Sequence, residues 1–329
     1  MQPRKITFSR NVFLPLTSVC RNHCGYCSFK TPVHDGCLMA QEDVEKTLRV
    51  GAELGCTEAL FTFGERPEEV PGFAAYLKQT GYSTILDYCE AMCRKSITIG
   101  ILPHTNAGIL TYEEMERLRA VNASMGLMLE TTAKIPAHAA SKGKEPEVRL
   151  GMIEDAGKLK IPFTTGLLLG IGESVVDREE SLLAIRDLHR KYGHIQEIII
   201  QNFCPKPGTP MAHYPVPGTD EICATIRMAR DILPKDIAIQ IPPNLIDASV
   251  LISCGVDDLG GVSPLTIDYI NPEHPWPGID ELQKIAGDAR LIERLCIYPQ
   301  YVKKGWYHPD LQLLINRLEQ TVKERSNQL

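Results

Sequence analysis

Three cysteines stand within eight residues near the start of the chain. Cys20, Cys24 and Cys27 have the spacing CxxxCxxC, which allows three thiolates to surround one centre. Thiolate ligands select zinc, copper(I) or the iron of an iron–sulfur cluster. A structural zinc site is normally closed by four protein ligands, whereas a cubic iron–sulfur cluster held by three cysteines leaves one iron free. The odd number of thiols therefore favours an iron–sulfur cluster with an open coordination position.

A zinc site stays open as an alternative, because His23, His34 or Cys37 could supply a fourth ligand. A second CxxxC pair, Cys89 and Cys93, lies in a segment with a helical pattern. Residues four apart on a helix share one face, so we interpret this pair as small buried side chains and not as a second metal site.

Composition restricts the class of protein. The chain has 329 residues, 43% of them hydrophobic, which suits one large barrel or two ordinary domains. A net charge of −6 provides no basic surface for nucleic acid. No apolar run approaches the roughly 20 residues of a membrane helix, and the first residues lack a signal peptide's apolar core. Eleven cysteines, irregularly spaced after the first three, do not predict a secreted disulfide framework. We therefore expect a cytoplasmic protein in reducing surroundings, with no nucleic acid or membrane partner.

Eight apolar runs alternate with helical segments along the chain. The expected strands are 11–16, 58–63, 97–102, 124–129, 162–169, 197–200, 237–241 and 256–262. The expected helices are 41–54, 71–94, 111–119, 147–159, 177–192, 220–233 and 247–253, with closing helices at 279–298 and 309–323. This alternation predicts parallel strands with crossover helices.

The predicted fold is a closed (β/α)8 TIM-type barrel, with an open six-stranded sheet as the alternative. We expect the barrel core to cover about 8–265 and a C-terminal cap with helical extension to cover about 266–329, in a single domain. The Pro-rich stretch 271–278 is expected to form part of that cap or a lid. In such barrels the catalytic groups lie on the loops that follow the strands, and the cysteine loop is the first of these.

The cysteine motif, with aromatic Tyr26 before the last thiol, resembles the signature of the radical S-adenosylmethionine (SAM) superfamily. The resemblance implies a [4Fe-4S] cluster on Cys20, Cys24 and Cys27, with SAM bound to the free iron. In that superfamily the reduced cluster cleaves SAM to methionine and a deoxyadenosyl radical. Tyr26 would then lie against the cofactor.

Three further elements resemble those with which biotin-synthase-like members of the superfamily hold SAM. Gly64 and Glu65, after the second strand, resemble the element that receives the SAM amino group. Glu130 matches an acidic position near the SAM ribose, and Arg149 matches an arginine that binds the SAM carboxylate, a suitable partner for guanidinium. The structural alternatives are a solvated turn carboxylate for Glu65, a helix-capping or salt-bridged glutamate for Glu130 and a surface arginine for Arg149.

Two loops resemble those that lie along the adenine in the same enzymes. One is the glycine-rich stretch 166–173, with Gly170 and Gly172, where the missing side chain permits close approach to a flat ring. The other is 201–210, with Asn202. Further polar residues are expected at the barrel mouth as candidate catalytic contacts to the second substrate, namely His104, Asn106, Gln201, Asn244 and Asp247.

Several longer stretches resemble the CofG-type subunits of deazaflavin (FO) synthase. They are CRNHCGYCSF (20–29), FTFGERPE (61–68), PHTNAG (103–108), TTGLLLGIGE (164–173) and QNFCPKPGTP (201–210). In that family the CofH subunit joins a tyrosine-derived hydroxybenzyl group to 5-amino-6-ribitylaminouracil. The CofG subunit closes this adduct, 5-amino-5-(4-hydroxybenzyl)-6-(D-ribitylimino)-5,6-dihydrouracil, to 7,8-didemethyl-8-hydroxy-5-deazariboflavin (FO) with loss of ammonia.

The resemblance also implies partners, namely CofH or its product and a low-potential electron donor. Two other functions remain as alternatives. One is another biotin-synthase-like radical enzyme, of the CofH, tyrosine lyase or hydrogenase maturase type. The other is a zinc-stabilised or electron-carrying barrel protein without catalytic activity.

Overall fold

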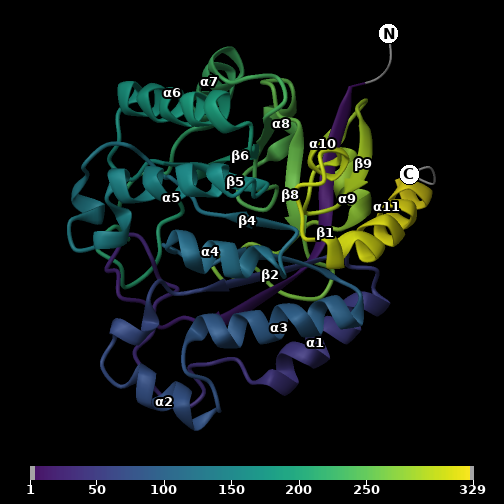
Figure 1. Ribbon diagram of the computed structural model, residues 1–329. Helices are drawn as coiled ribbons and strands as arrows, with labels where there is room; N and C mark the ends of the chain where they lie inside the picture. Colours follow the sequence, from purple (N-terminus) through teal and green to yellow (C-terminus); the bar gives the residue numbers. More distant parts are fainter. Residues whose placement is uncertain (1–3, 327–329) are drawn as a thin grey trace.

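Eight parallel strands close into a barrel in the computed structural model, which describes residues 4–326 (Figure 1). The strands follow one another in chain order, and β1 pairs with both β8 and β2 to complete the ring. They are β1 (Lys5–Thr17), β2 (Glu58–Phe63), β3 (Leu102–Asn106), β4 (Ser124–Gly126), β5 (Phe163–Leu169), β6 (Ile195–Asn202), β7 (Ala238–Gln240) and β8 (Asp258–Val262). The closed barrel predicted from the sequence is confirmed, and the open six-stranded sheet is excluded.

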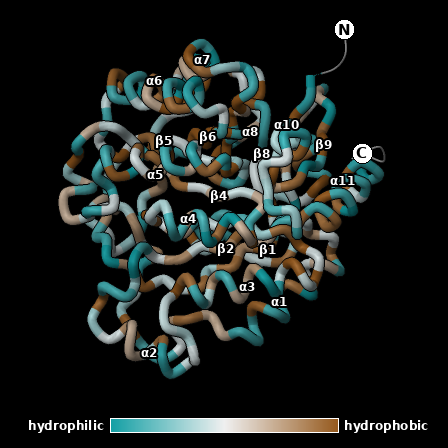
Figure 2. The backbone as a smooth tube through the Cα atoms, viewed as in Figure 1, coloured by the Kyte–Doolittle hydropathy of each residue, from teal (hydrophilic) through white to brown (hydrophobic). Residues whose placement is uncertain are grey.

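Helices surround this barrel on the outside (Figure 1). They are α1 (Gln41–Glu53), α2 (Phe73–Gln79), α3 (Ile85–Ile99), α4 (Tyr112–Arg119), α5 (Pro146–Lys158), α6 (Val175–Tyr192), α7 (Thr219–Ile232) and α8 (Ala248–Ile252). Hydrophobic and hydrophilic residues alternate along them in Figure 2, as expected for helices with one buried face. Thr111 and Glu114 form a capping box at the start of α4.

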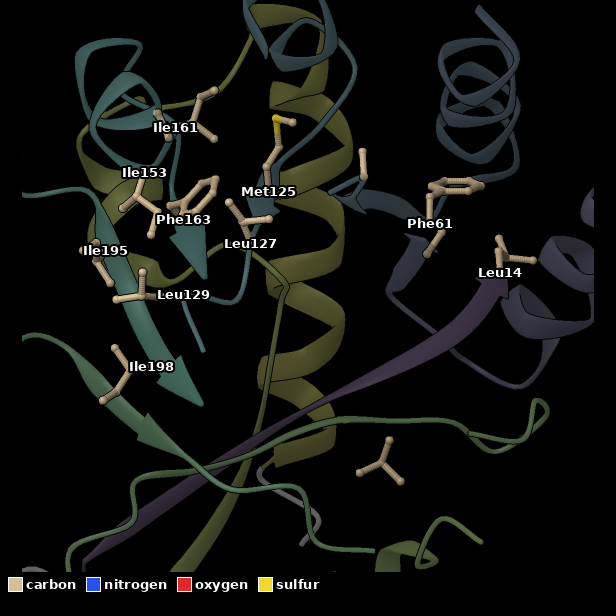
Figure 3. Close-up of a cluster of buried hydrophobic side chains, with 14 of the residues drawn as sticks. Leu14, Phe61, Met125, Leu127, Leu129, Ile153, Ile161, Phe163, Ile195 and Ile198 are labelled. Atoms are coloured by element: carbon tan, nitrogen blue, oxygen red, sulfur yellow. The ribbon is translucent and has the colours of Figure 1, made fainter. Parts of the chain in front are cut away.

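The main hydrophobic core lies between the strands and these helices. Figure 3 shows Phe163, Ile195 and Ile198 of β5 and β6 beside Ile153 of α5, with Leu14 of β1 further along the same layer. All five side chains are completely buried. The outer faces of the strands are therefore occupied by packing, which leaves their inner faces for the functional site.

The third strand differs from the prediction. The segment 97–102 was expected to be a strand, but α3 continues to Ile99 and ends at Gly100, whose φ of 106° suits glycine. Ile97 and Ile99 belong to the last turn of this helix and pack against the core. The strand is Leu102–Asn106, so His104 and Asn106 lie in the barrel wall and not in the turn after it.

The prediction of one closing helix over residues 279–298 is also wrong. The structure has a short helix α9 (Ile279–Ala286), a ninth strand β9 (Arg290–Arg294) and then an irregular segment that leads to α10 (Pro299–Lys303). Strand β9 pairs in parallel with the first half of β1, from Lys5 to Ser9. The final helix, expected at 309–323, is α11 (Gln312–Ser326).

The segment after β9 passes beneath the barrel and closes its floor. The Ser124 hydroxyl and the Gln196 amide both donate hydrogen bonds to the Cys296 carbonyl, at 2.8 and 2.9 Å. Arg294 enters the interior, where its guanidinium contacts Glu197 at 2.8 Å and Asp258 at 2.6 Å. All three side chains are buried, so each charge depends on the others for its compensation.

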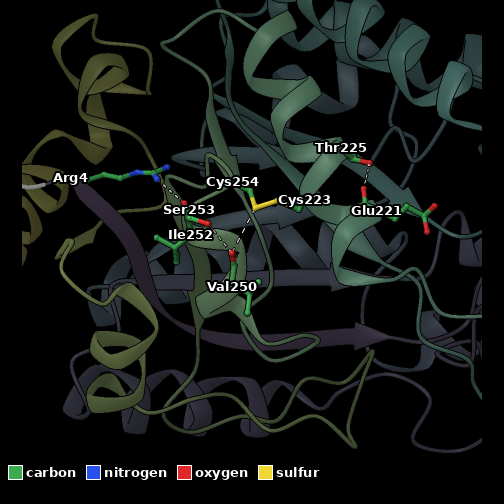
Figure 4. Close-up of a disulfide and its surroundings, with 8 residues drawn as sticks. All are labelled: Arg4, Glu221, Cys223, Thr225, Val250, Ile252, Ser253 and Cys254. Atoms are coloured by element: carbon green, nitrogen blue, oxygen red, sulfur yellow. Dashed lines mark hydrogen bonds between the residues drawn. A yellow bond between two sulfur atoms is a disulfide. The ribbon is translucent and has the colours of Figure 1, made fainter.

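Two of the eleven cysteines form a disulfide, which the sequence did not predict. Cys223 of α7 is joined to Cys254, just after α8 (Figure 4). The other nine are free. Cys89 and Cys93 are buried on α3, as interpreted from their spacing. None of the helices between residues 4 and 326 combines the length and the apolar character required to cross a membrane.

The buried ion pairs of Arg294 predict that replacing this residue strongly lowers the stability of the protein. Arg294→Leu should lower the free energy of unfolding by about 3–5 kcal/mol, because it leaves Glu197 and Asp258 as buried, uncompensated carboxylates. Urea denaturation followed by circular dichroism measures this change. Arg49→Leu is the control, because Arg49 forms an exposed ion pair with Glu45 on α1 and should change stability by less than about 1 kcal/mol. Similar losses in the two variants would contradict the structural role of Arg294.

Candidate functional site

A cavity of about 420 Å³ lies inside the barrel, between the floor segment and the loops that follow the strands. Its wall is formed by inward-facing side chains of the strands, together with residues of the loops above them. Six of the residues proposed from the sequence line it, namely Tyr26, His104, Asn106, Glu130, Arg149 and Gln201. Asn244 and Asp247 do not line the cavity, nor do Gly64, Glu65, Gly170, Gly172 and Asn202.

The cysteine loop follows β1 at the open end of the barrel. Its three thiols, Cys20, Cys24 and Cys27, are free and partly exposed. The Glu65 amide donates a hydrogen bond to the Cys20 sulfur at 3.3 Å, and the Ser141 hydroxyl lies 3.5 Å from the Cys24 sulfur. Burial raises the pKa of both thiols, and the nearby Cys27 contributes to each shift. Cys27 is therefore close enough to both Cys20 and Cys24 to influence them electrostatically.

These thiols fit a centre with three sulfur ligands better than a zinc site. Of the candidates for a fourth zinc ligand, His23 lies 3.0 Å from Lys30 Nζ, His34 lies 2.7 Å from the Asp35 carbonyl oxygen, and Cys37 is buried. Within residues 4–326, no three His, Cys, Asp or Glu side chains are already arranged to hold a metal ion. Hydrogen bonds to sulfur such as those from Glu65 and Ser141 are typical of iron–sulfur sites. A bound cluster would draw the three thiolates together.

Glu130 occupies the centre of the polar contacts below this loop. Its carboxylate accepts hydrogen bonds from the Tyr26 hydroxyl and from Lys144, and His138 Nε2 lies 3.0 Å from the same group. Burial alone would raise the pKa of Glu130, but Lys144 and Arg149 outweigh this effect and lower it well below its ordinary value. Glu130 is therefore ionised at neutral pH, and its partners act as donors.

The backbone at Glu130 is unusual. Its φ is 69°, in the left-handed region that residues with a side chain rarely adopt. The conformation is held by a hydrogen bond from the Glu130 amide to the Gly166 carbonyl at 2.8 Å and by another from the Leu168 amide to the Glu130 carbonyl at 3.2 Å. Backbone strain of this kind persists where surrounding contacts hold it, and it is concentrated at functional sites.

Arg149 lies between two buried carboxylates. One terminal nitrogen is 3.9 Å from Glu65 and the other is 3.9 Å from Glu130. The side chain also donates to the carbonyls of Gly143 and Met128. Arg149 is 3% exposed, which excludes the alternative of a surface arginine.

Several contacts also fix the side chain of Glu65. Arg21 contacts its carboxylate at 3.0 Å, and the Ile109 amide donates to the same group at 3.3 Å. Gly108 and Gly143 pack directly against this side chain, and a Cβ atom at Gly143 would overlap its Oε1. The carboxylate of Glu65 thus points toward Arg21 and Arg149, while its backbone amide faces the cysteine loop.

The glycine-rich loop after β5 has two residues in the left-handed region, Gly170 with φ of 90° and Gly172 with φ of 112°. A Cβ at Gly170 would lie 2.6 Å from Pro217, so this glycine is needed for packing within the protein. Gly172 is more open, since a Cβ there would meet only Ile135 at 3.9 Å. Glu173 accepts hydrogen bonds from the Gly170 and Ile171 amides and so stabilises the loop itself.

His104 projects into the cavity from β3. Its Nδ1 lies 2.6 Å from the Ser124 hydroxyl, which donates its hydrogen to the Cys296 carbonyl. Donation from Nδ1 to Ser124 places the lone pair on Nε2, which lies 3.2 Å from Asn106 Oδ1, so the neutral ring can donate to only one of these two oxygens. Burial lowers the pKa of His104, with Glu58 opposing this effect, so the neutral form is favoured.

The segment 263–278 covers the cavity from one side, in agreement with the predicted lid. Asn271 and Trp276 line the cavity, and Glu273 pairs with Lys206 on the loop after β6. Asn244 donates to Asp268 at 3.0 Å and to the His274 carbonyl at 3.1 Å, so it anchors this segment. Asp247 is exposed and caps α8 through the Ser249 amide.

Comparison with known proteins supports the same interpretation of the cysteine loop. The family model described as the radical SAM superfamily matches residues 14–185. The chain belongs to this superfamily. Membership implies a [4Fe-4S] cluster and SAM as cofactors.

Relatives of nearly full length define the family more narrowly. The 7,8-didemethyl-8-hydroxy-5-deazariboflavin synthase of Methanoregula boonei is 71% identical over 100% of both chains. The protein of the same name from Methanosphaerula palustris is 66% identical over 98% of both chains. The chain is thus a member of this synthase family. The FeFe-hydrogenase maturase HydG from Carboxydothermus hydrogenoformans shares the fold, with a TM-score of 0.67 at 18% identity over 96% of this chain and 81% of the maturase.

Two residues that contact Glu130 in this radical SAM protein were not identified from the sequence. Lys144 and His138 lie in the connection between β4 and α5, which contains two 3-10 turns, Pro136–His138 and Lys142–Lys144. This connection contacts the cysteine loop through the Gly25 amide, which donates to the Ala137 carbonyl at 2.8 Å. The unusual length of the β4–α5 connection was the feature of the sequence that could have indicated a functional role for these two residues.

Close packing around Glu65 predicts that Gly143 does not tolerate a side chain. Gly143→Ala should lower the free energy of unfolding by about 1–3 kcal/mol, because the new methyl group displaces a buried, paired carboxylate. Gly151→Ala is a matched control in the following helix α5, where nothing lies within 4 Å of the added Cβ. That change should stabilise the protein by about 0.5–1 kcal/mol. Urea unfolding compares the two, and equal stabilities would contradict the packing described.

Proposed function

We propose that this protein is the ring-closing, CofG-type subunit of FO synthase. It would convert the hydroxybenzyl adduct of 5-amino-6-ribitylaminouracil to FO and release ammonia. The observation that carries the proposal is the position of the three-cysteine loop, whose Tyr26 lines the barrel cavity, in a chain that is 71% identical over its full length to a synthase of that name.

Cys20, Cys24 and Cys27 would bind the cluster, and the residues around Glu130 would bind SAM. Arg149 is suited to the SAM carboxylate, since it already lies between two carboxylates, Glu65 and Glu130, at distances longer than a hydrogen bond. Glu130 is ionised and could accept hydrogen bonds from the ribose hydroxyls. The backbone at Gly64 and Glu65 would receive the amino group.

An apolar cluster beside Tyr26 is suited to the adenine. It consists of Ile135, Leu168, Ile171, Phe203 and Met211, all of them buried. Gly172 contributes open space next to Ile135. Asn202 is buried, and its amide lies 3.5 Å from the Leu245 carbonyl, so we propose that it positions the loop and does not touch the ring.

When bound, the reduced cluster and SAM supply a deoxyadenosyl radical that takes one hydrogen from the adduct. The chain itself aligns the adduct and keeps water away from it. Trp276 and Asn271 cover one side of the cavity, and the floor segment closes the other end. In the tautomer in which Nδ1 donates to Ser124, neutral His104 could accept a proton at Nε2 as the ring closes.

The proposal requires two partners. The adduct must come from CofH, either by diffusion or by transfer within a complex. A low-potential electron donor must reduce the cluster. The contacts in the cavity do not favour the alternative of a tyrosine lyase or hydrogenase maturase activity. The likeness to HydG, at 18% identity, concerns the fold alone.

Replacement of the three cysteines tests the cluster. Cys20→Ala, Cys24→Ala and Cys27→Ala should each abolish the brown iron–sulfur absorption after anaerobic reconstitution, because each removes one of the ligands. Cys89→Ala and Cys93→Ala are matched controls, since both thiols are buried on α3 and lie near Thr105. They should retain the absorption. A full chromophore in all three loop variants would refute the assignment.

Turnover with defined substrates tests the reaction. The reconstituted protein, given SAM, a reductant and the CofH product, should form fluorescent FO and deoxyadenosine together. Without that product, deoxyadenosine should remain at the background level, because the radical would have no properly placed hydrogen. Deoxyadenosine release with free tyrosine alone would favour a tyrosine lyase instead. FO formed by CofH without this protein would refute the proposal.

A further inference from the structure

Three buried carboxylates lie at the floor of the barrel, and only one of them lacks a cationic partner and has an oxygen that accepts no hydrogen bond from residues 4–326. Glu197 accepts from Thr164, Tyr298 and Arg294, and Asp258 accepts from Arg294, Thr7 and the Gly260 amide. Both are therefore satisfied within the protein. Arg294 completes its own contacts through the Leu295 carbonyl.

Glu58 is the exception among the three. It is 6% exposed and lines the cavity, but it forms no ion pair with any residue between 4 and 326. Its one hydrogen bond comes from the Ser9 hydroxyl, 2.6 Å from Oε2. A buried carboxylate normally accepts several hydrogen bonds, and its desolvation is costly without them. The second oxygen, Oε1, is available to a ligand.

Asn11 on the neighbouring strand β1 also has an oxygen atom that accepts no hydrogen bond. It is 2% exposed and lines the cavity, and its Oδ1 is buried without a donor among the described residues. Buried carbonyl oxygens are rarely left unpaired, so such a group calls for an explanation. The interior of a barrel of this type is ordinarily filled by apolar side chains, which makes a hydrogen-bond acceptor here the more unusual.

Glu58 offers a free acceptor to the cavity. The amide of Asn11 offers its Nδ2 donor, because Oδ1 is enclosed by the protein. Ser9 adds no free donor, since its hydroxyl hydrogen goes to Glu58. A ligand group that satisfies this subsite must therefore bring O–H or N–H donors to the deepest part of the cavity. An aromatic ring face there would leave the charge of Glu58 without compensation.

The geometry points to this subsite as the binding place of the ribityl chain, whose hydroxyls donate to Glu58 and accept from Asn11 Nδ2. The inference rests on the proposed function and adds the orientation of the adduct. The polyol lies at the floor, the pyrimidine at the level of His104, and the hydroxybenzyl group toward the cysteine loop. A hydroxyl group both donates and accepts hydrogen bonds, so a flexible polyol can satisfy the carboxylate and the amide together.

Binding of two pyrimidine probes tests the orientation without requiring turnover. The reconstituted protein is titrated by anaerobic calorimetry with 5-amino-6-ribitylaminouracil and with 5-amino-6-methylaminouracil, which lacks the polyol. The ribityl probe should bind roughly tenfold more tightly or better, as hydrogen bonds to a charged group imply. Glu58→Gln should reduce this preference to within about threefold, because a neutral amide accepts more weakly.

Asn11→Ala provides a second variant, which removes the Nδ2 donor and should also reduce the preference. It leaves no protein group unpaired, because the Asn11 side chain has no hydrogen-bond partner among residues 4–326. Glu113→Gln is the matched control, because Glu113 is exposed on α4 and should leave the preference unchanged. Equal affinities of the two probes for the unmodified protein would overturn the inference. An equal loss for both probes in Glu58→Gln would overturn it too.

Two further measurements separate this inference from the proposed function. If Glu58→Gln weakens binding of 4-hydroxybenzyl alcohol and not of the ribityl probe, the adduct lies in the reverse orientation and the inference fails. Ring closure by the unmodified protein is assayed in parallel. Closure with no ribityl preference refutes the orientation alone, whereas absence of closure refutes the proposed function and this inference with it.

Discussion

The chain of alternating charges from Arg21 through Glu65, Arg149 and Glu130 to Lys144 is the interaction on which the site depends. Its members come from the cysteine loop, from the ends of β2 and β4, from the β4–α5 connection and from α5. Glu65, Glu130 and Arg149 are each buried, so none can lose its partner without a large desolvation cost. The charges therefore fix these separate segments in one arrangement before any cofactor binds.

Glu65 shows how this arrangement connects the two parts of the site. Its backbone amide donates to the Cys20 sulfur, and its side chain is held by Arg21 close to Arg149. A displacement of the cysteine loop would thus be transmitted to the guanidinium that we propose for SAM binding. Gly64, Gly108 and Gly143 permit this close packing, because a side chain at any of them would overlap neighbouring atoms. These glycines are needed by the protein's own packing, independently of ligand binding.

Sequence reasoning located the barrel, the cysteine loop and the strand ends, because each depends on local patterns or on a short motif. It misplaced β3, since the apolar end of α3 and the following strand are separated only by Gly100 and Ile101. It missed β9, whose five residues follow a helix directly and show too little alternation to be distinguished from it. Lys144 and His138 could not be assigned to Glu130 from sequence, because their contacts arise only when a long connection folds across the barrel mouth. Glu58 was visible as a charged residue at the start of an apolar strand, but its lack of a partner is a property of the assembled interior.

The two ends of the cavity differ in a way that follows from these contacts. At the mouth, each of the buried carboxylates Glu65 and Glu130 lies beside two of the cations Arg21, Lys144 and Arg149, and Arg21 also pairs with the more exposed Glu69. At the floor, Arg294 is shared by Glu197 and Asp258, and Glu58 has no cationic partner among residues 4–326. A substrate that brings neutral donors to the floor reduces the cost of burying Glu58 without introducing a further charge. The same substrate leaves the mouth free for a carboxylate-bearing cofactor, so the two ligands can occupy one barrel without competing for the same partners.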